Sequence, residues 1–133
     1  MRLCIDSAAL YALLDREHAK HRSLADAWRQ LADGSDEVIA HSYAVLEAAE
    51  LIQRALPRAA VGAFFDDLLA PVKVVWVDQR LHEAAVAAML VRLDQDLTLS
   101  DWVTYRVARQ HHAAGVMALD GRFRFLGLAQ IPS

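Results

Sequence analysis

Short runs of apolar residues, each bounded by charged or turn-forming residues, are the feature that most limits how this chain can fold. Three of these runs, residues 3–5, 72–77 and 116–119, are hydrophobic throughout rather than alternating, which is typical of parallel strands buried on both faces. Residues 37–40 form a weaker fourth run, and residues 128–131 fit a last strand at the sheet edge. The pattern therefore predicts a mostly parallel central sheet of four to five strands.

Stretches with apolar residues at helical spacing separate the predicted strands. One stretch stops before Pro57 and another before Pro71, where proline would interrupt a helix. The predicted helices span residues 8–14, 18–31, 43–56, 58–69, 80–93 and 99–112. Because strands alternate with helices and no linker or repeat divides the chain, we expect one α/β domain covering residues 1–133.

The composition excludes several classes of protein. A chain with 56% hydrophobic and 23% charged residues is globular rather than disordered. Charges interrupt every apolar stretch well before the roughly 18 residues that a membrane-spanning helix needs. Asp6 follows the N-terminus too closely to leave room for a signal peptide. We therefore expect a soluble, cytoplasmic protein with no membrane partner. Its one cysteine, Cys4, excludes an internal disulfide and is expected to be buried.

The net charge does not exclude a nucleic-acid substrate. With 14 basic and 17 acidic residues the chain carries −3 overall, which by itself argues against binding a polyanion. However, if four carboxylates belong to one site, the rest of the chain carries 14 − 13 = +1. A mildly basic surface around an acidic site is compatible with this composition.

Acidic residues stand where a parallel sheet places its ligand site, beyond the carboxyl ends of the strands. Asp6, Asp78 and Asp120 each follow a predicted strand, although aspartate is also a favoured helix cap and turn residue. Taken one at a time, capping is the favoured interpretation. Glu47 lies among small and apolar helix residues, and Asp101 lies near a helix start, where the helix dipole favours a carboxylate.

A divalent cation is the natural reason to gather such carboxylates. Like charges brought together without counterions repel one another. Mg²⁺ or Mn²⁺ takes oxygen ligands and leaves positions open for water and phosphate. In such a cluster the ion activates a water and stabilises charge on an attacked phosphodiester. The acidic residues therefore indicate metal-dependent hydrolysis.

The order, spacing and local contexts of these acids resemble the PIN-domain family, and the length is similar to that of a VapC-type toxin ribonuclease. No single motif is specific, but the joint pattern spans almost the whole chain. The matching contexts are Asp6-Ser7 leading into a helix, Ser42 through Glu47, Asp96 through Asp101, and Asp120-Gly121-Arg122-Phe123 followed by Gly127. The sequence departs from the family pattern in two places, at Gly121 and at Ser7-Ala8, but neither departure removes an acid.

The resemblance implies a PIN-like three-layer α/β/α sandwich and a metal-dependent endoribonuclease, the toxin of a type II toxin–antitoxin pair. It implies that Asp6, Glu47, Asp101 and Asp120 hold Mg²⁺ or Mn²⁺, with Asp96 as a further acid close to the site. A metal-activated water would hydrolyse tRNA or ribosomal RNA. The partners implied are a cognate antitoxin and a second copy of the chain in a homodimer.

Other residues receive less specific interpretations. Arg122 is nominated as an RNA-backbone contact, and Asp78 is interpreted as a helix cap. Trp76 is placed in a buried strand. His41 is interpreted as a surface residue at a strand end.

Three alternatives to the metal ribonuclease remain. The first is a catalytically silent PIN-fold binding module that acts through a protein partner. The second is a phosphatase-like hydrolase with Asp6 as nucleophile, which is disfavoured because Ala8 stands where that mechanism needs a second carboxylate. The third is a zinc site at His18 and His21, three residues apart on a predicted helix, but no third ligand follows at a recognisable spacing.

Overall fold

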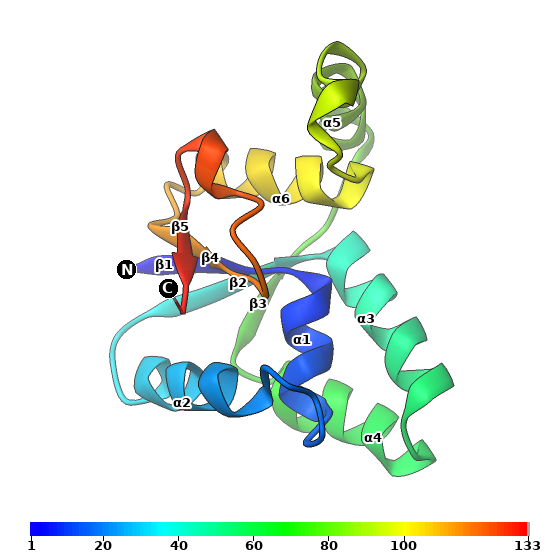
Figure 1. Cartoon of the computed structure of the whole chain (residues 1–133), viewed down its shortest axis with the longest axis vertical. Helices are drawn as coiled ribbons and strands as arrows, with labels where there is room; N and C mark the ends of the chain where they lie inside the picture. The colour runs from blue at the N-terminus through cyan, green and yellow to red at the C-terminus, as the bar shows by residue number, and fades with distance from the viewer. Residues whose placement is uncertain (133) are drawn as a thin grey trace.

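The computed structural model describes residues 1–132, and it shows a five-stranded, entirely parallel sheet in the order β3-β2-β1-β4-β5 (Figure 1). The predicted α/β class and the number of strands are confirmed. The strands are β1 (Arg2–Ile5), β2 (Glu37–His41), β3 (Val72–Val75), β4 (Gly115–Met117) and β5 (Ala129–Ile131). The helices are α1 (Ser7–Leu14), α2 (His21–Ala32), α3 (Ser42–Ala55), α4 (Arg58–Ala63), α5 (Gln79–Val91) and α6 (Leu99–Gln110).

Helices cover both faces of the sheet, which makes the three-layer sandwich (Figure 1). Successive strand residues point to opposite faces. Ile5 and Met117 pack into a core beneath α1, α2, α3 and α4, whereas Cys4 and Val116 pack into a second core beneath α5 and α6. The strands are buried on both faces, as their continuous hydrophobicity predicts.

The β4–β5 edge depends on a glycine. A Cβ atom at Gly115 would lie 2.6 Å from the carbonyl oxygen of Ala129, so any side chain there would push the two strands apart. This edge matters for the site because the loop between β4 and β5 carries Asp120 and Arg122.

Two local predictions are wrong. The helix predicted over residues 18–31 begins at His21, because Asp15 and His18 side chains accept hydrogen bonds from the backbone of Glu17 and Lys20 and hold a turn. His18 and His21 therefore do not share a helix. Trp76 is 78% exposed, since β3 is an edge strand that ends at Val75.

The helix predicted over residues 58–69 is α-helical only over Arg58–Ala63. A π-helical turn, Phe64–Leu68, follows it directly. Cys4 is buried as expected, and burial raises the pKa of its thiol to about 12. Across residues 1–132, no helix combines the length and the apolar character needed to span a bilayer.

Candidate active site

The strand order places a ligand site beside the central strand. β1 pairs with β2 on one side and with β4 on the other, so the direction of chain progression reverses between β1 and β4. Ligands of open parallel sheets bind at this switch point, outside the carboxyl ends of the strands. Asp6 follows β1, Asp120 follows β4, and Asp101 lies in the first turn of α6.

Asp6 is a buried carboxylate among other charges. It caps α1, and its Oδ1 accepts a hydrogen bond from the Ala9 backbone at 2.9 Å, so the predicted capping role is real. The side chain is only 6% exposed. Burial raises the pKa of Asp6 to about 7, against the lowering effect of the Ala9 bond; Asp101 and Asp120 raise the pKa further, and Arg122 lowers it. Three acids therefore share one electrostatic environment.

Asp101 is buried and held in a fixed orientation. It forms a capping box with Thr98: the Asp101 backbone N–H donates to Thr98 Oγ1 at 3.1 Å, and Asp101 Oδ2 accepts from the Thr98 backbone at 3.0 Å. The capping box explains why a carboxylate stands here, and it also fixes where the second oxygen, Oδ1, is held.

Arg122 joins Asp101 to Asp120. Its Nε and Nη2 donate to the two oxygens of Asp120 at 3.0 and 3.1 Å, while Nη1 lies 3.2 Å from Asp101 Oδ2. These bonds to Arg122 lower the pKa of Asp120 and raise the pKa of Arg122. The guanidinium is thus an internal cation between the acids, in a place where the sequence predicts a contact to RNA.

Glu47 lies on α3, and its Oε1 is buried with no hydrogen-bond partner. A buried, unsatisfied carboxylate oxygen is costly unless a ligand or an ion completes it. In the described part of the chain, no three His, Cys, Asp or Glu side chains are close enough together to hold one metal ion as they stand. Glu47 is also absent from the charges that shift the pKa of Asp6.

The donor chemistry nevertheless fits a hard divalent cation. All four candidate ligands supply carboxylate oxygens, the type that Mg²⁺ and Mn²⁺ prefer. The unsatisfied Oε1 of Glu47 indicates a missing partner of positive charge, whereas burial is the main cause of the raised pKa of Asp6. Arg122 supplies part of that charge to Asp101 and Asp120, and a metal ion would compete with it.

Asp96 lies beside the site. It has a left-handed backbone conformation, with φ of 55°, after a short 3₁₀ turn. Asp96, Asp120 and Arg122 line one open pocket of about 330 Å³ together with Gln95, Leu97 and Phe125. The pocket brings the further acid near Asp120 without a direct bond between them.

The interpretation of His41 as a surface residue is wrong, because the side chain is buried and holds two elements of the site together. It is 2% exposed, and burial lowers the pKa of its imidazole to about 4, so the ring is neutral near pH 7. Nδ1 accepts from the Ala44 backbone at 3.1 Å, so Nε2 carries the proton and donates to Thr104 Oγ1 at 2.8 Å. His41 thereby ties the start of α3, which carries Glu47, to α6, which carries Asp101. The only sequence signal was its place directly before the Glu47 helix.

The interpretation of Asp78 as a helix cap is confirmed. Asp78 caps α5 through a hydrogen bond from the Leu81 backbone to its Oδ1 at 2.8 Å. Trp102, next to Asp101, is buried.

Comparison with known proteins identifies the fold. No protein-family model and no curated protein matches the sequence. The structure resembles Mycobacterium tuberculosis VapC20, a Sarcin-Ricin loop cleaving toxin, with a TM-score of 0.82, 24% identity and 96% of each chain covered. It also resembles Rickettsia felis VapBC2 bound to a promoter DNA fragment, with a TM-score of 0.73 and 11% identity. The match covers 98% of this chain and 97% of that chain. FitAcB from Neisseria gonorrhoeae gives a TM-score of 0.68 at 14% identity, with 96% of this chain and 95% of that chain covered.

The chain therefore has the PIN-like fold, as its resemblance to that family predicts. In all three comparisons the similarity extends over nearly the full length of both chains.

Proposed function

We propose that this protein is a metal-dependent endoribonuclease and the toxin of a toxin–antitoxin pair. The observation that carries the proposal is the gathering of Asp6, Asp101 and Asp120 around Arg122 at the switch point of the sheet. A structural neighbour over 96% of the chain is a Sarcin-Ricin loop cleaving toxin, which supports RNA as the substrate.

In this proposal Asp6, Glu47, Asp101 and Asp120 hold Mg²⁺ or Mn²⁺, and Asp96 stands beside them. When bound, the ion supplies a Lewis acid that activates water and stabilises the charge of the attacked phosphodiester. The α1 cap orients Asp6, the Thr98 capping box orients Asp101, and His41 holds α3 against α6. Arg122, once released from the carboxylates, is placed to contact the RNA backbone.

The partners follow from the same proposal. Structural neighbours include VapBC2 and FitAB, each bound to a DNA fragment, which supports a cognate antitoxin for this chain. Self-association into a homodimer is supported by exposed apolar side chains near the end of α5, Leu90, Val91 and Leu93.

A catalytically silent binding module is the second candidate. It is favoured by one observation, the guanidinium of Arg122 between Asp101 and Asp120, because a permanent internal cation would leave no room for a metal ion. Cleavage and metal titration separate the two candidates.

Purified protein is expected to cut total tRNA or ribosomal RNA at discrete positions with Mn²⁺, and to leave 5′-phosphate and 3′-hydroxyl ends. Sequencing of adaptor-ligated ends measures both the positions and the end chemistry. EDTA should abolish the cuts and added Mn²⁺ restore them. Folded, Mn²⁺-bound protein that cuts neither RNA would contradict the proposal and favour the binding module.

A further inference from the structure

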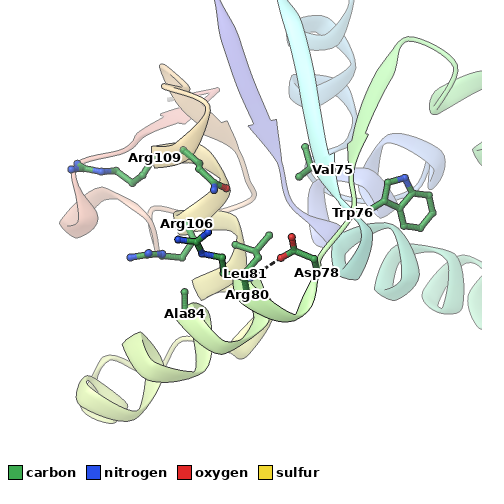
Figure 2. A pocket seen from close by; sticks show the side chains of 9 residues that line it. Val75, Trp76, Asp78, Arg80, Leu81, Ala84, Arg106 and Arg109 are labelled. Carbon is green, nitrogen blue, oxygen red and sulfur yellow. Dashed lines mark hydrogen bonds between the residues drawn. The ribbon is translucent and has the colours of Figure 1, made fainter.

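A second groove lies beside the candidate active site and is lined by none of its four acids. Its volume is about 700 Å³, and it is formed by the exit of β3, the first turn of α5 and the second half of α6 (Figure 2). Three arginines line it: Arg80, Arg106 and Arg109. Figure 2 shows these arginines on the α5 and α6 side, with Asp78 and Trp76 on the β3 side.

The arginines of the groove have no partners of their own. All three are exposed, and within residues 1–132 none forms an ion pair or a side-chain hydrogen bond. The one carboxylate in the groove, Asp78, uses its Oδ1 to cap α5. The groove therefore carries two more positive than negative charges.

Two features of this placement work against helix stability, although Arg109, in the last turn of α6, suits the helix dipole. Arg106 and Arg109 are like charges three residues apart on α6, a spacing that destabilises a helix. Arg80 lies in the first turn of α5, where the helix dipole disfavours a cation. Departures from such local rules concentrate at functional sites.

The positive charge continues past the groove to the end of α6. Burial and the nearby charges of Lys73 and Arg2 lower the pKa of His111, while Glu37 raises it. Lys73 is exposed on β3 and lies outside any ion pair of the described chain. Lys73 therefore adds one further positive charge near the end of α6, whereas Arg2 is paired with Glu37.

The groove begins close to the candidate active site. All strands are parallel, so Trp76 follows β3 at the same end of the sheet, the carboxyl end of the strands, at which Asp6 follows β1. Along α6, Arg106 and Arg109 are five and eight residues beyond Asp101, which is roughly 8 and 12 Å along a helix axis. A single strand held at the carboxylates reaches the groove within a few nucleotides.

We propose that this groove binds the phosphate backbone of the RNA strand flanking the cleavage site, with Trp76 stacking on an unpaired base. The proposal rests on the nuclease function proposed above. Guanidinium groups bind phosphate oxygens through paired hydrogen bonds, and an exposed indole at the end of a basic groove is typical of single-strand binding surfaces.

The test is fluorescence anisotropy of a labelled, unstructured RNA oligonucleotide, titrated with protein in EDTA over a series of salt concentrations. The Arg106→Gln/Arg109→Gln variant is expected to bind at least about tenfold more weakly and to lower the salt slope by about 1.4, since each lost phosphate contact removes about 0.7 for a single strand. Trp76→Ala is expected to weaken binding about tenfold with an unchanged slope.

The control is Arg54→Gln/Arg58→Gln, which removes the same charge from exposed arginines on the opposite layer. Equal binding by the groove and control variants would overturn the inference. A second outcome is that oligoglutamate binds the wild type but not the groove variant, while RNA binds both equally. This result would assign the groove to an acidic protein segment instead. A change in oligomeric state of the groove variant, measured by light scattering, would assign it to a second copy.

The two proposals fail separately. Groove-dependent RNA binding without any cleavage would overturn only the nuclease function. Metal-dependent cleavage, with RNA binding by the groove variant equal to that of the control, would overturn only the groove.

Discussion

Replacing Asp6 with Asn is expected to stabilise the metal-free protein, and to stabilise it more at pH 8 than at pH 5. The unfolded chain releases the Asp6 proton near its ordinary pKa, about 4, whereas the folded protein holds that proton until about pH 7. The folded state therefore binds more protons between these values, so the free energy of unfolding falls as pH rises from about 4 to about 7. Above pH 7 the full penalty of burying the charge is present.

The size of the effect follows from the shift. Three pKa units correspond to roughly 4 kcal/mol at most, or an increase in melting temperature of about 10 °C for Asp6→Asn at pH 8. Asparagine caps a helix as well as aspartate, so the bond from Ala9 is retained.

The matched control is Asp78→Asn, an exposed carboxylate that caps α5 through the same type of bond, for which no such gain is expected. Thermal melts in EDTA at both pH values measure the difference. A melting temperature that does not rise at pH 8, or that rises equally at pH 5, would show that Asp6 does not carry a buried charge. Saturating Mn²⁺ should reverse the order, because only the wild type gains from binding.

Replacing Arg122 with Gln is expected to raise the affinity for Mn²⁺. The guanidinium of Arg122 holds both oxygens of Asp120 and lies 3.2 Å from Asp101, so a metal ion must break these contacts to use both acids. Arg122 is partly exposed, which weakens its ion pairs by solvent screening. We therefore expect an increase of about tenfold, or roughly 1.4 kcal/mol, in a calorimetric titration.

Arg124→Gln is the control, since Arg124 is exposed in the same loop and has no ion pair in the described chain. Unchanged Mn²⁺ affinity in Arg122→Gln would mean that Arg122 does not compete with the metal. Weaker binding would mean that Arg122 supports the ligands instead. The same variant should bind RNA more weakly if Arg122 also contacts the backbone.

The sheet and its layers were predictable because they depend on local sequence. Continuous apolar runs predict strands buried on both faces. Asp6 directly follows β1, and Asp120 lies in the loop that follows β4. The position of Asp101 was predictable too, since the helix dipole favours a carboxylate near a helix start. Helix starts were less certain where side chains hold a competing turn, as Asp15 and His18 do.

The side-chain contacts that hold the site together were not predictable in the same way. His41 bonds to Thr104 across 63 positions, and Arg122 reaches Asp101 across 21. No periodicity records such pairs, because they arise from the packing of elements that are distant in the chain. The exposure of Trp76 follows from the edge position of β3, which depends on strand order rather than on the composition of the strand itself.

The most direct test of the central claim is the initial rate of RNA cleavage for four single variants with Mn²⁺: Asp6→Asn, Glu47→Gln, Asp101→Asn and Asp120→Asn. Each change removes one carboxylate charge and keeps the shape of the side chain. We predict that each variant loses at least about 100-fold in rate. Asp78→Asn, which also replaces a carboxylate that follows a strand, should retain the wild-type rate within about threefold.

Circular dichroism confirms that each variant is folded, and the expected stability gain of Asp6→Asn separates its loss of activity from unfolding. Wild-type rates in all four variants would contradict the four-carboxylate site. A wild-type rate in Glu47→Gln alone would remove Glu47 from the site and leave Asp6, Asp101 and Asp120.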